Sequence, residues 1–255
     1  MTKNRTASWR TTLRLSWQRL REQGSWFTAG GRWTARLPRP PRRNLRRFWF
    51  AGIFASASNS IVLTYLSLFI LALGGTRAQI GLMSSLSSLS AALLLLPGAA
   101  LVERWGRRKQ IVVLSGGGVS RVMLLLLALS PLAFTGPAAI YIAIALAITR
   151  SGFANLGMPA WTSLTADIVP LKWRGRYFSS RNIAMGIANM VTTSLVGLLI
   201  ARAGVPRGYQ LAMGLAFVVG MASTYSFARL NDKGPRPPAL TAPQAAARSA
   251  QANIL

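Results

Sequence analysis

The chain contains six apolar stretches, each close to the length that an α-helix needs to cross a lipid bilayer. They lie near residues 48–73, 80–102, 111–131, 138–160, 183–201 and 209–228. A hydrocarbon core about 30 Å thick requires roughly 20 consecutive apolar residues in helical form. Glycine or proline residues separate each stretch from the next. The sequence therefore predicts an all-α membrane protein with six transmembrane helices.

The distribution of charge supports this prediction and indicates an orientation. The chain is 51% hydrophobic and yet carries a formal charge of +26. Of its 30 Lys and Arg residues, 25 lie before residue 48, in the second and fourth connections and after the last stretch, whereas only Arg77, Arg202 and Arg207 lie in the opposite connections. Positive residues favour the cytoplasmic side, so we expect both termini in the cytoplasm, as an even number of spans requires. This flanking pattern explains the basic residues without a nucleic-acid partner.

Two terminal segments flank the predicted transmembrane domain, which covers residues 48–229. Residues 1–47 are basic and carry apolar residues at helical spacing, namely Trp9, Leu13, Trp17 and Leu20. This pattern is compatible with an amphipathic helix on the membrane surface and equally with a disordered basic leader. Prolines predict a break before the first span, at Pro38, Pro40 and Pro41. Residues 230–255 have the composition of a disordered cytoplasmic tail.

Several kinds of chemistry are disfavoured by what the sequence lacks. It has no Cys and no His, which removes the usual zinc ligand sets, and no nucleophile–base pair is visible. We therefore expect no metal, no cofactor and no enzymatic activity.

The connection after the second stretch carries a recognisable motif. It reads Ala-Ala-Leu-Val-Glu-Arg-Trp-Gly-Arg-Arg-Lys over residues 99–109 and combines one carboxylate with a glycine turn and basic residues. It resembles the signature loop of the major facilitator superfamily at Leu101, Arg104, Gly106, Arg107 and Arg108, with Glu103 in place of the usual Asp. We expect Glu103 to hold this loop against the end of a neighbouring helix.

A second connection is similar to another loop of the same superfamily. Asp167, Pro170, Arg174 and Gly175 match a D-x-x-P-x-x-x-R-G pattern between the fourth and fifth spans. The preceding Pro-Ala-Trp at residues 159–161 resembles a bacterial branch, which implies a bacterial inner membrane. The alternative for both loops is ordinary basic flanking sequence.

The resemblance covers residues 45–230, one six-helix half of the superfamily fold. It implies two three-helix inverted repeats, and transport of a small solute by alternating access at a site between two halves. The second half would come from another chain or from self-association, unless the gene is truncated. The alternative from another class is a membrane scaffold or assembly subunit that does not transport.

Polar residues inside the spans are the candidate solute site. A charge at bilayer depth costs about 2.5–3.5 kcal/mol on insertion scales, so it usually faces a bundle interior or an aqueous cavity. The resemblance places the first, second, fourth and fifth spans at the cavity and the third and sixth outside it. The candidates on this basis are Arg150, Asn59, Asn155, Asn189 and Tyr65. The alternative for each Asn is an interhelical hydrogen bond. Cationic groups favour an anionic or zwitterionic solute.

The other intramembrane arginine, Arg121, receives a different interpretation. It lies in the third span, which the resemblance places away from the cavity. We expect a structural role, in which its guanidinium bonds to carbonyls or Asn side chains of neighbouring helices. The preceding glycines at residues 116–118 permit close helix approach.

Overall fold

The computed structural model describes residues 39–230 as a bundle of long helices joined by short connections, without strands in that range. The elements are α2 (Arg39–Ala72), α3 (Arg77–Trp105), α4 (Arg108–Val112), the π-helix η2 (Val113–Val119), α5 (Ser120–Ala133), α6 (Pro137–Leu156), α7 (Met158–Ile168), the 3-10 turn η3 (Leu171–Trp173), α8 (Arg174–Ala203) and α9 (Arg207–Ala228). Six helical segments are long and apolar enough to cross a membrane. The predicted all-α, six-span architecture is confirmed.

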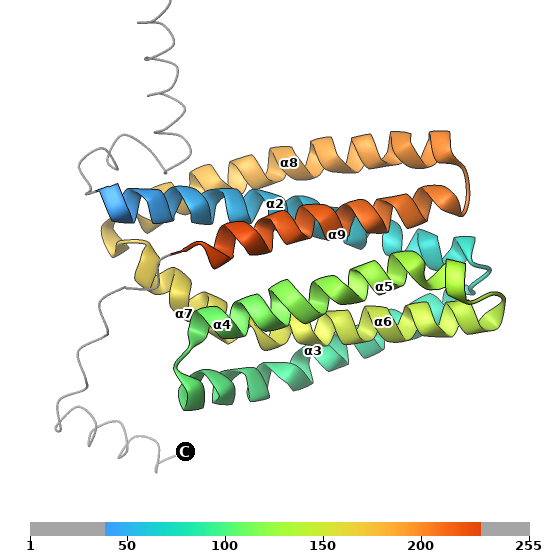
Figure 1. The fold of residues 1–255 in the computed structure, drawn as a ribbon, viewed down its shortest axis with the longest axis horizontal. Helices are drawn as coiled ribbons and strands as arrows, with labels where there is room; N and C mark the ends of the chain where they lie inside the picture. The colour runs from blue at the N-terminus through green and yellow to red at the C-terminus, as the bar shows by residue number, and fades with distance from the viewer. Residues whose placement is uncertain (1–38, 231–255) are drawn as a thin grey trace, which may run out of the picture.

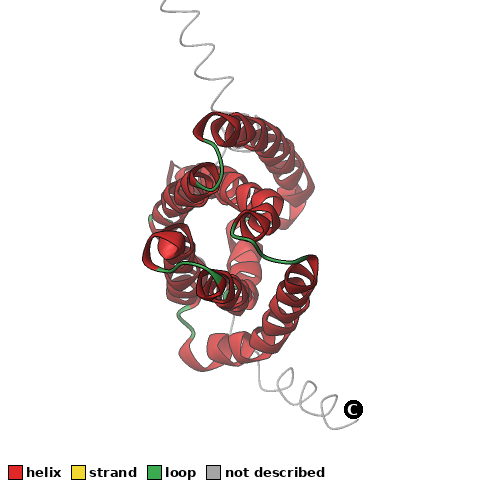
Figure 2. Ribbon diagram, turned by 90° about the vertical axis from the view of Figure 1, so that its right-hand side faces the viewer, coloured by secondary structure: helices red, strands yellow, loops and turns green. Residues whose placement is uncertain are grey.

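The six spans run alternately up and down the bundle (Figure 1). α2, α3, α8 and α9 each form one span, α4, η2 and α5 together form the third, and α6 and α7 form the fourth. Seen end-on, the spans surround a common centre (Figure 2). Figure 1 places α8 at the top of the bundle and α3 at the bottom.

Two spans begin earlier than the hydropathy predicts. α2 starts at Arg39, with Pro40 and Pro41 in its first turn. The missing proline N–H groups cost nothing there, because the first N–H groups of a helix have no partner within it. Pro40 and Pro41 therefore lie inside helix α2 rather than in a break before it, and Pro38 lies outside the described residues. α8 starts at Arg174 rather than near residue 183, since its basic first turns remain helical.

The helix contacts follow an internal symmetry. α2 packs against α9 and α8, while α6 packs against α5 and α3, and α5 packs against α9. Exchanging the first three spans for the last three leaves this set of pairs unchanged. The pairing agrees with two three-helix repeats, as the resemblance implies.

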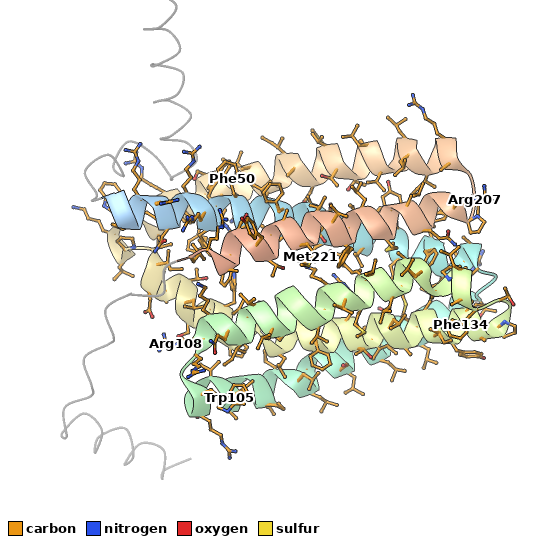
Figure 3. The ribbon with its side chains drawn as sticks, in the orientation of Figure 1. Phe50, Trp105, Arg108, Phe134, Arg207 and Met221 are labelled. Atoms are coloured by element: carbon orange, nitrogen blue, oxygen red, sulfur yellow. The ribbon has the colours of Figure 1, made fainter. Side chains whose placement is uncertain are left out.

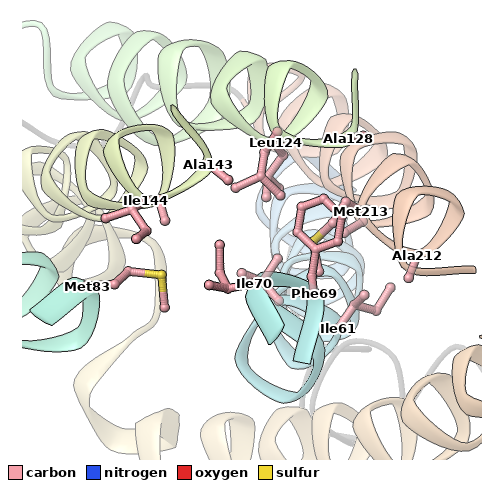
Figure 4. Close-up of a cluster of buried hydrophobic side chains, with 14 of the residues drawn as sticks. Ile61, Phe69, Ile70, Met83, Leu124, Ala128, Ala143, Ile144, Ala212 and Met213 are labelled. Atoms are coloured by element: carbon pink, nitrogen blue, oxygen red, sulfur yellow. The ribbon is translucent and has the colours of Figure 1, made fainter. Parts of the chain in front are cut away.

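Two apolar clusters hold the bundle together. The aliphatic cluster joins the far part of α2 to five other elements and includes Ile61, Phe69, Leu124, Ile144 and Met213 (Figure 4). The aromatic cluster lies near the start of α2 and includes Leu45, Phe48, Trp49, Tyr177 and Phe227. Tyr177 is fully buried, and its Oη donates to the Leu45 carbonyl at 2.8 Å, which fixes α8 to the start of α2.

The two described ends of the chain lie at the same end of the bundle (Figure 1). Trp105 and Arg108, in the connection after the second span, also lie there, whereas Phe134 and Arg207 lie at the opposite end (Figure 3). The predicted amphipathic pattern before residue 39 and the tail after residue 230 lie outside the described residues.

Candidate functional site

A cavity of about 440 Å³ lies in the bundle beside the aromatic cluster, whose Phe48 and Phe227 line it. Its walls come from α2, α4, η2, α5, α6, α7, α8 and α9, and α3 contributes no lining residue. This differs from the expected set of spans, because residues of the third and sixth spans line this cavity and none of the second does. Its lining includes three arginines, Arg121, Arg150 and Arg181, and no Asp or Glu.

Arg150 projects from α6 towards α2. Its Nη2 donates to the Asn59 Oδ1 at 3.1 Å. Asn59 itself is exposed on the bundle surface, while Arg150 is half-buried. Two of the five residues predicted as solute ligands therefore meet at the open side of the cavity.

Arg121 lies deeper and borders the same cavity. Its side chain is only 7% exposed, and its Nη1 donates to the Ser58 Oγ at 2.7 Å. Ser58 in turn donates to the Ala216 carbonyl at 2.6 Å, so one serine connects α5, α2 and α9. The guanidinium fits against Gly220, where a Cβ would lie 2.8 Å from Arg121 Cζ. The expected position away from the cavity is not what the structure has, and the bonded partner is a hydroxyl.

Arg181 is the site residue that the sequence analysis missed. It was counted with the basic connection before the fifth span, but it lies inside α8 and is 6% exposed. Its guanidinium stacks over the Phe48 ring at 4.7 Å from the centroid and lies 5.9 Å from that of Trp161. Gly52 makes room for it, because any Cβ at this position would overlap the guanidinium.

The spacing of Arg181 from the predicted ligand Asn189 was the signal that could have identified it. Arg181, Met185 and Asn189 follow each other at intervals of four residues, which places them on one face of a helix. All three line the cavity. Extending the fifth span to the beginning of its helix would have put the arginine on the same face as the predicted ligand Asn189.

The three guanidinium groups are poorly supplied with acceptors. The buried Nε atom of each lacks a hydrogen-bond partner within the described part of the chain. Each guanidinium carries five N–H donors, of which Arg121 and Arg150 each use one and Arg181 none among these residues. Unpaired buried donors and charges carry a desolvation cost that an anionic acceptor would relieve.

Asn189 also takes part in the cavity wall. Its side-chain amide lies 2.7 Å from the Ser56 hydroxyl, in hydrogen-bond contact between α8 and α2. This contact lies between the level of Gly52 and that of Asn59 along α2.

The other two predicted ligands lie elsewhere. Asn155 donates from Nδ2 to the Ser151 carbonyl of its own helix at 3.0 Å. Tyr65 donates from Oη to the Thr193 carbonyl at 2.7 Å and so joins α2 to α8. Neither residue lines the cavity.

The two motif loops meet at the end of the bundle. Arg108 pairs with Asp167 at 2.8 Å, which connects the second and fourth connections directly. Arg174 donates to the Ala166 and Val169 carbonyls. Pro170 directly follows Val169, and Gly175 directly follows Arg174. The acid that holds the loops together is therefore Asp167.

Glu103 does not make the expected contact. It is exposed beside Arg104 and makes no hydrogen bond or ion pair with any residue in the described range. Gly106 ends α3 in the left-handed conformation at φ 60° and donates from N–H to the Val102 carbonyl at 3.1 Å. Arg107 follows this turn and is exposed.

The comparisons with known proteins give one match. A family model described as Major Facilitator Superfamily matches residues 48–254, well over half of the chain. No curated protein and no solved structure matches.

Proposed function

Because the chain belongs to the major facilitator superfamily, we propose that it moves a small anionic solute across the membrane by alternating access. The observation that carries this proposal is the cavity with three arginines and no lining carboxylate. In the low-dielectric interior of a membrane protein, such groups retain their charge only with a counter-charge or with water nearby. A solute anion supplies that counter-charge.

An anion fits this cavity better than a zwitterion does. The carboxylate of a zwitterion would pair with a guanidinium, but its ammonium would face the remaining arginines. No lining Asp or Glu is present to receive it. The proposed first contact is with Arg150 and Asn59, which offer N–H donors at the open side of the cavity.

A second six-span bundle completes the transport path in this proposal. Asn59 is exposed at bilayer depth, and the neighbouring cavity residue Leu63 is 83% exposed. A polar amide is costly against lipid, so another bundle covers this side. The partner is either a separate chain or a second copy of this one, and both termini face the cytoplasm, in a bacterial inner membrane.

The test is a binding screen on the purified full chain in lipid nanodiscs. The panel contains inorganic phosphate, benzoate and dicarboxylates as anions, alanine and glycine betaine as zwitterions, and glucose as a neutral solute. We expect only the anions in this panel to raise the midpoint of thermal unfolding. Arg150→Leu should abolish this shift, whereas Arg202→Leu, an exposed arginine outside the cavity lining, should retain it.

Transport is then measured in proteoliposomes with the radiolabelled anion that binds most tightly. Uptake dependent on Arg150 supports the transporter, and a chain that binds no solute and stays associated with an unrelated membrane complex is a scaffold. A shift produced only by zwitterions or glucose, or a normal shift in Arg150→Leu, contradicts the proposal.

A further inference from the structure

The three cavity arginines form two groups at different depths. Arg121 and Arg150 are bonded to the adjacent residues Ser58 and Asn59 of α2. Arg181 instead lies against Gly52 of the same helix. Asn59 lies seven positions after Gly52, which corresponds to about 10 Å along a helix axis. The cavity therefore has a paired cationic end and a single cationic end, about two helical turns apart.

The α2 wall between these ends is continuous. Phe48, Gly52, Ser56, Asn59 and Leu63 all line the cavity, and their spacing of three or four residues puts them on one face of the helix. Ser56 lies midway and contacts Asn189. The middle of the wall is thus polar and uncharged, whereas each end is cationic.

The Arg181 end has the features of a built binding site. Arg181 is only 6% exposed, and its Nε has no hydrogen-bond partner within residues 39–230. The guanidinium carbon lies 4.7 Å from the Phe48 ring centroid and 5.9 Å from that of Trp161, so aromatic rings border the group. A guanidinium with a partnerless Nε–H can bind a carboxylate or phosphate through two parallel hydrogen bonds.

We infer that the solute carries two anionic groups about two helical turns apart, one bound by Arg121 and Arg150 and the other by Arg181. This inference rests on the proposed function and specifies the substrate class of the same cavity. The extended dianion lies along the α2 face, with its middle beside Ser56 and Asn189. A solute with one anionic group leaves one cationic end unpaired.

The experiment compares ligands that differ only in charge or in length. Suberate is an extended dicarboxylate of suitable span, monomethyl suberate has the same chain with one charge removed, and succinate has both charges at a shorter spacing. Binding to the full chain in nanodiscs is measured by titration calorimetry. We expect suberate to bind at least ten-fold more tightly than either other ligand. Apolar burial cannot make suberate bind more tightly than monomethyl suberate, since the monoester is the more apolar of these two ligands.

Variants then assign the second anionic group. In Arg181→Leu the ratio of suberate to monoester affinity should fall towards one, and Arg181→Lys should restore part of it because it retains the charge without the planar donors. The ligand comparison on the unmodified chain needs no variant, so poor folding of Arg181→Leu does not remove the test. Arg202→Leu is the control and should keep the full ratio.

The outcomes separate this inference from the proposed function. If no anion binds the unmodified chain, the proposed function fails. If anions bind in an Arg150-dependent manner but suberate is no tighter than its monoester, only the dianion inference is overturned. An unchanged ratio in folded Arg181→Leu also overturns it.

Discussion

Arg121 and Ser58 form a buried hydrogen bond of 2.7 Å between α5 and α2, and the same serine hydroxyl donates to Ala216 of α9. Ser58 is fully buried, so both bonds lie away from the bilayer. A single hydroxyl thus orients a charged side chain and holds three helices together. This arrangement gives Arg121 a fixed position at the cavity rather than a variable one.

Ser58→Ala should lower the stability of the protein. The change removes an acceptor from Arg121 and a donor from the Ala216 carbonyl, and we expect a loss of about 1–2 kcal/mol. The matched control is Ser60→Ala, since the Ser60 hydroxyl bonds only to Ala57 of its own helix. The measurement is the thermal midpoint in detergent. Equal midpoints for the two variants would contradict the proposed role of Ser58.

Gly98→Ala should disrupt the packing of α3 on α6. A Cβ at Gly98 would overlap the Leu156 carbonyl oxygen and would lie 3.1 Å from its carbon, and backbone atoms cannot move aside as a flexible side chain can. We expect a loss of about 1–3 kcal/mol. Gly81→Ala in the same helix meets no atom within 4 Å and should be neutral or slightly stabilising. Comparable unfolding curves for both variants would show that the close approach is unimportant.

Asp167→Asn should weaken the junction between the motif loops more than Glu103→Gln does. Asp167 pairs with Arg108 at the partly exposed end of the bundle, so the effect should be about 0.5 kcal/mol and should shrink at high salt. The double variant Arg108→Asp with Asp167→Arg, which exchanges the two charges, should restore most of the lost stability. The readout is the midpoint at low and high salt. A larger effect of Glu103→Gln would instead support the contact expected from the motif.

Reporter fusions test the orientation. The bias of 25 basic residues against 3 predicts a cytoplasmic signal from fusions at residue 40 and at residue 240. A fusion at residue 135, in the connection between the third and fourth spans, should report the opposite side. A periplasmic signal from either terminal fusion would exclude the proposed orientation.

The number and order of the spans were predictable, because a membrane requires long apolar helices whatever their packing. The start of the fifth span was not, since hydropathy falls across the basic residues that begin α8 while the helix continues. That error excluded Arg181 from the predicted site.

The direction in which individual side chains point from their helices could not be predicted either. Arg150, Asn59 and Asn189 do line a cavity, but Asn155 bonds within its own helix and Tyr65 bonds to α8. Depth along a span follows from residue counting, whereas the direction of a side chain depends on helix rotation and packing. Residue counting along a span does not give that rotation.

The π-helix η2 determines the rotation of Arg121. Residues 113–119 use bonds to the fifth residue along instead of the fourth, so the third span accommodates an additional residue just before Arg121. The hydroxyl of Thr224 in α9 donates to the carbonyl of Gly117 in this segment at 3.2 Å. A regular α-helix over the same residues would turn Arg121 by about 100° relative to every earlier position of the span, whereas removing one glycine from residues 116–118 would restore the α-helical bonds with nearly the present facing. The wide turn therefore absorbs one additional residue and keeps the two ends of this span in phase.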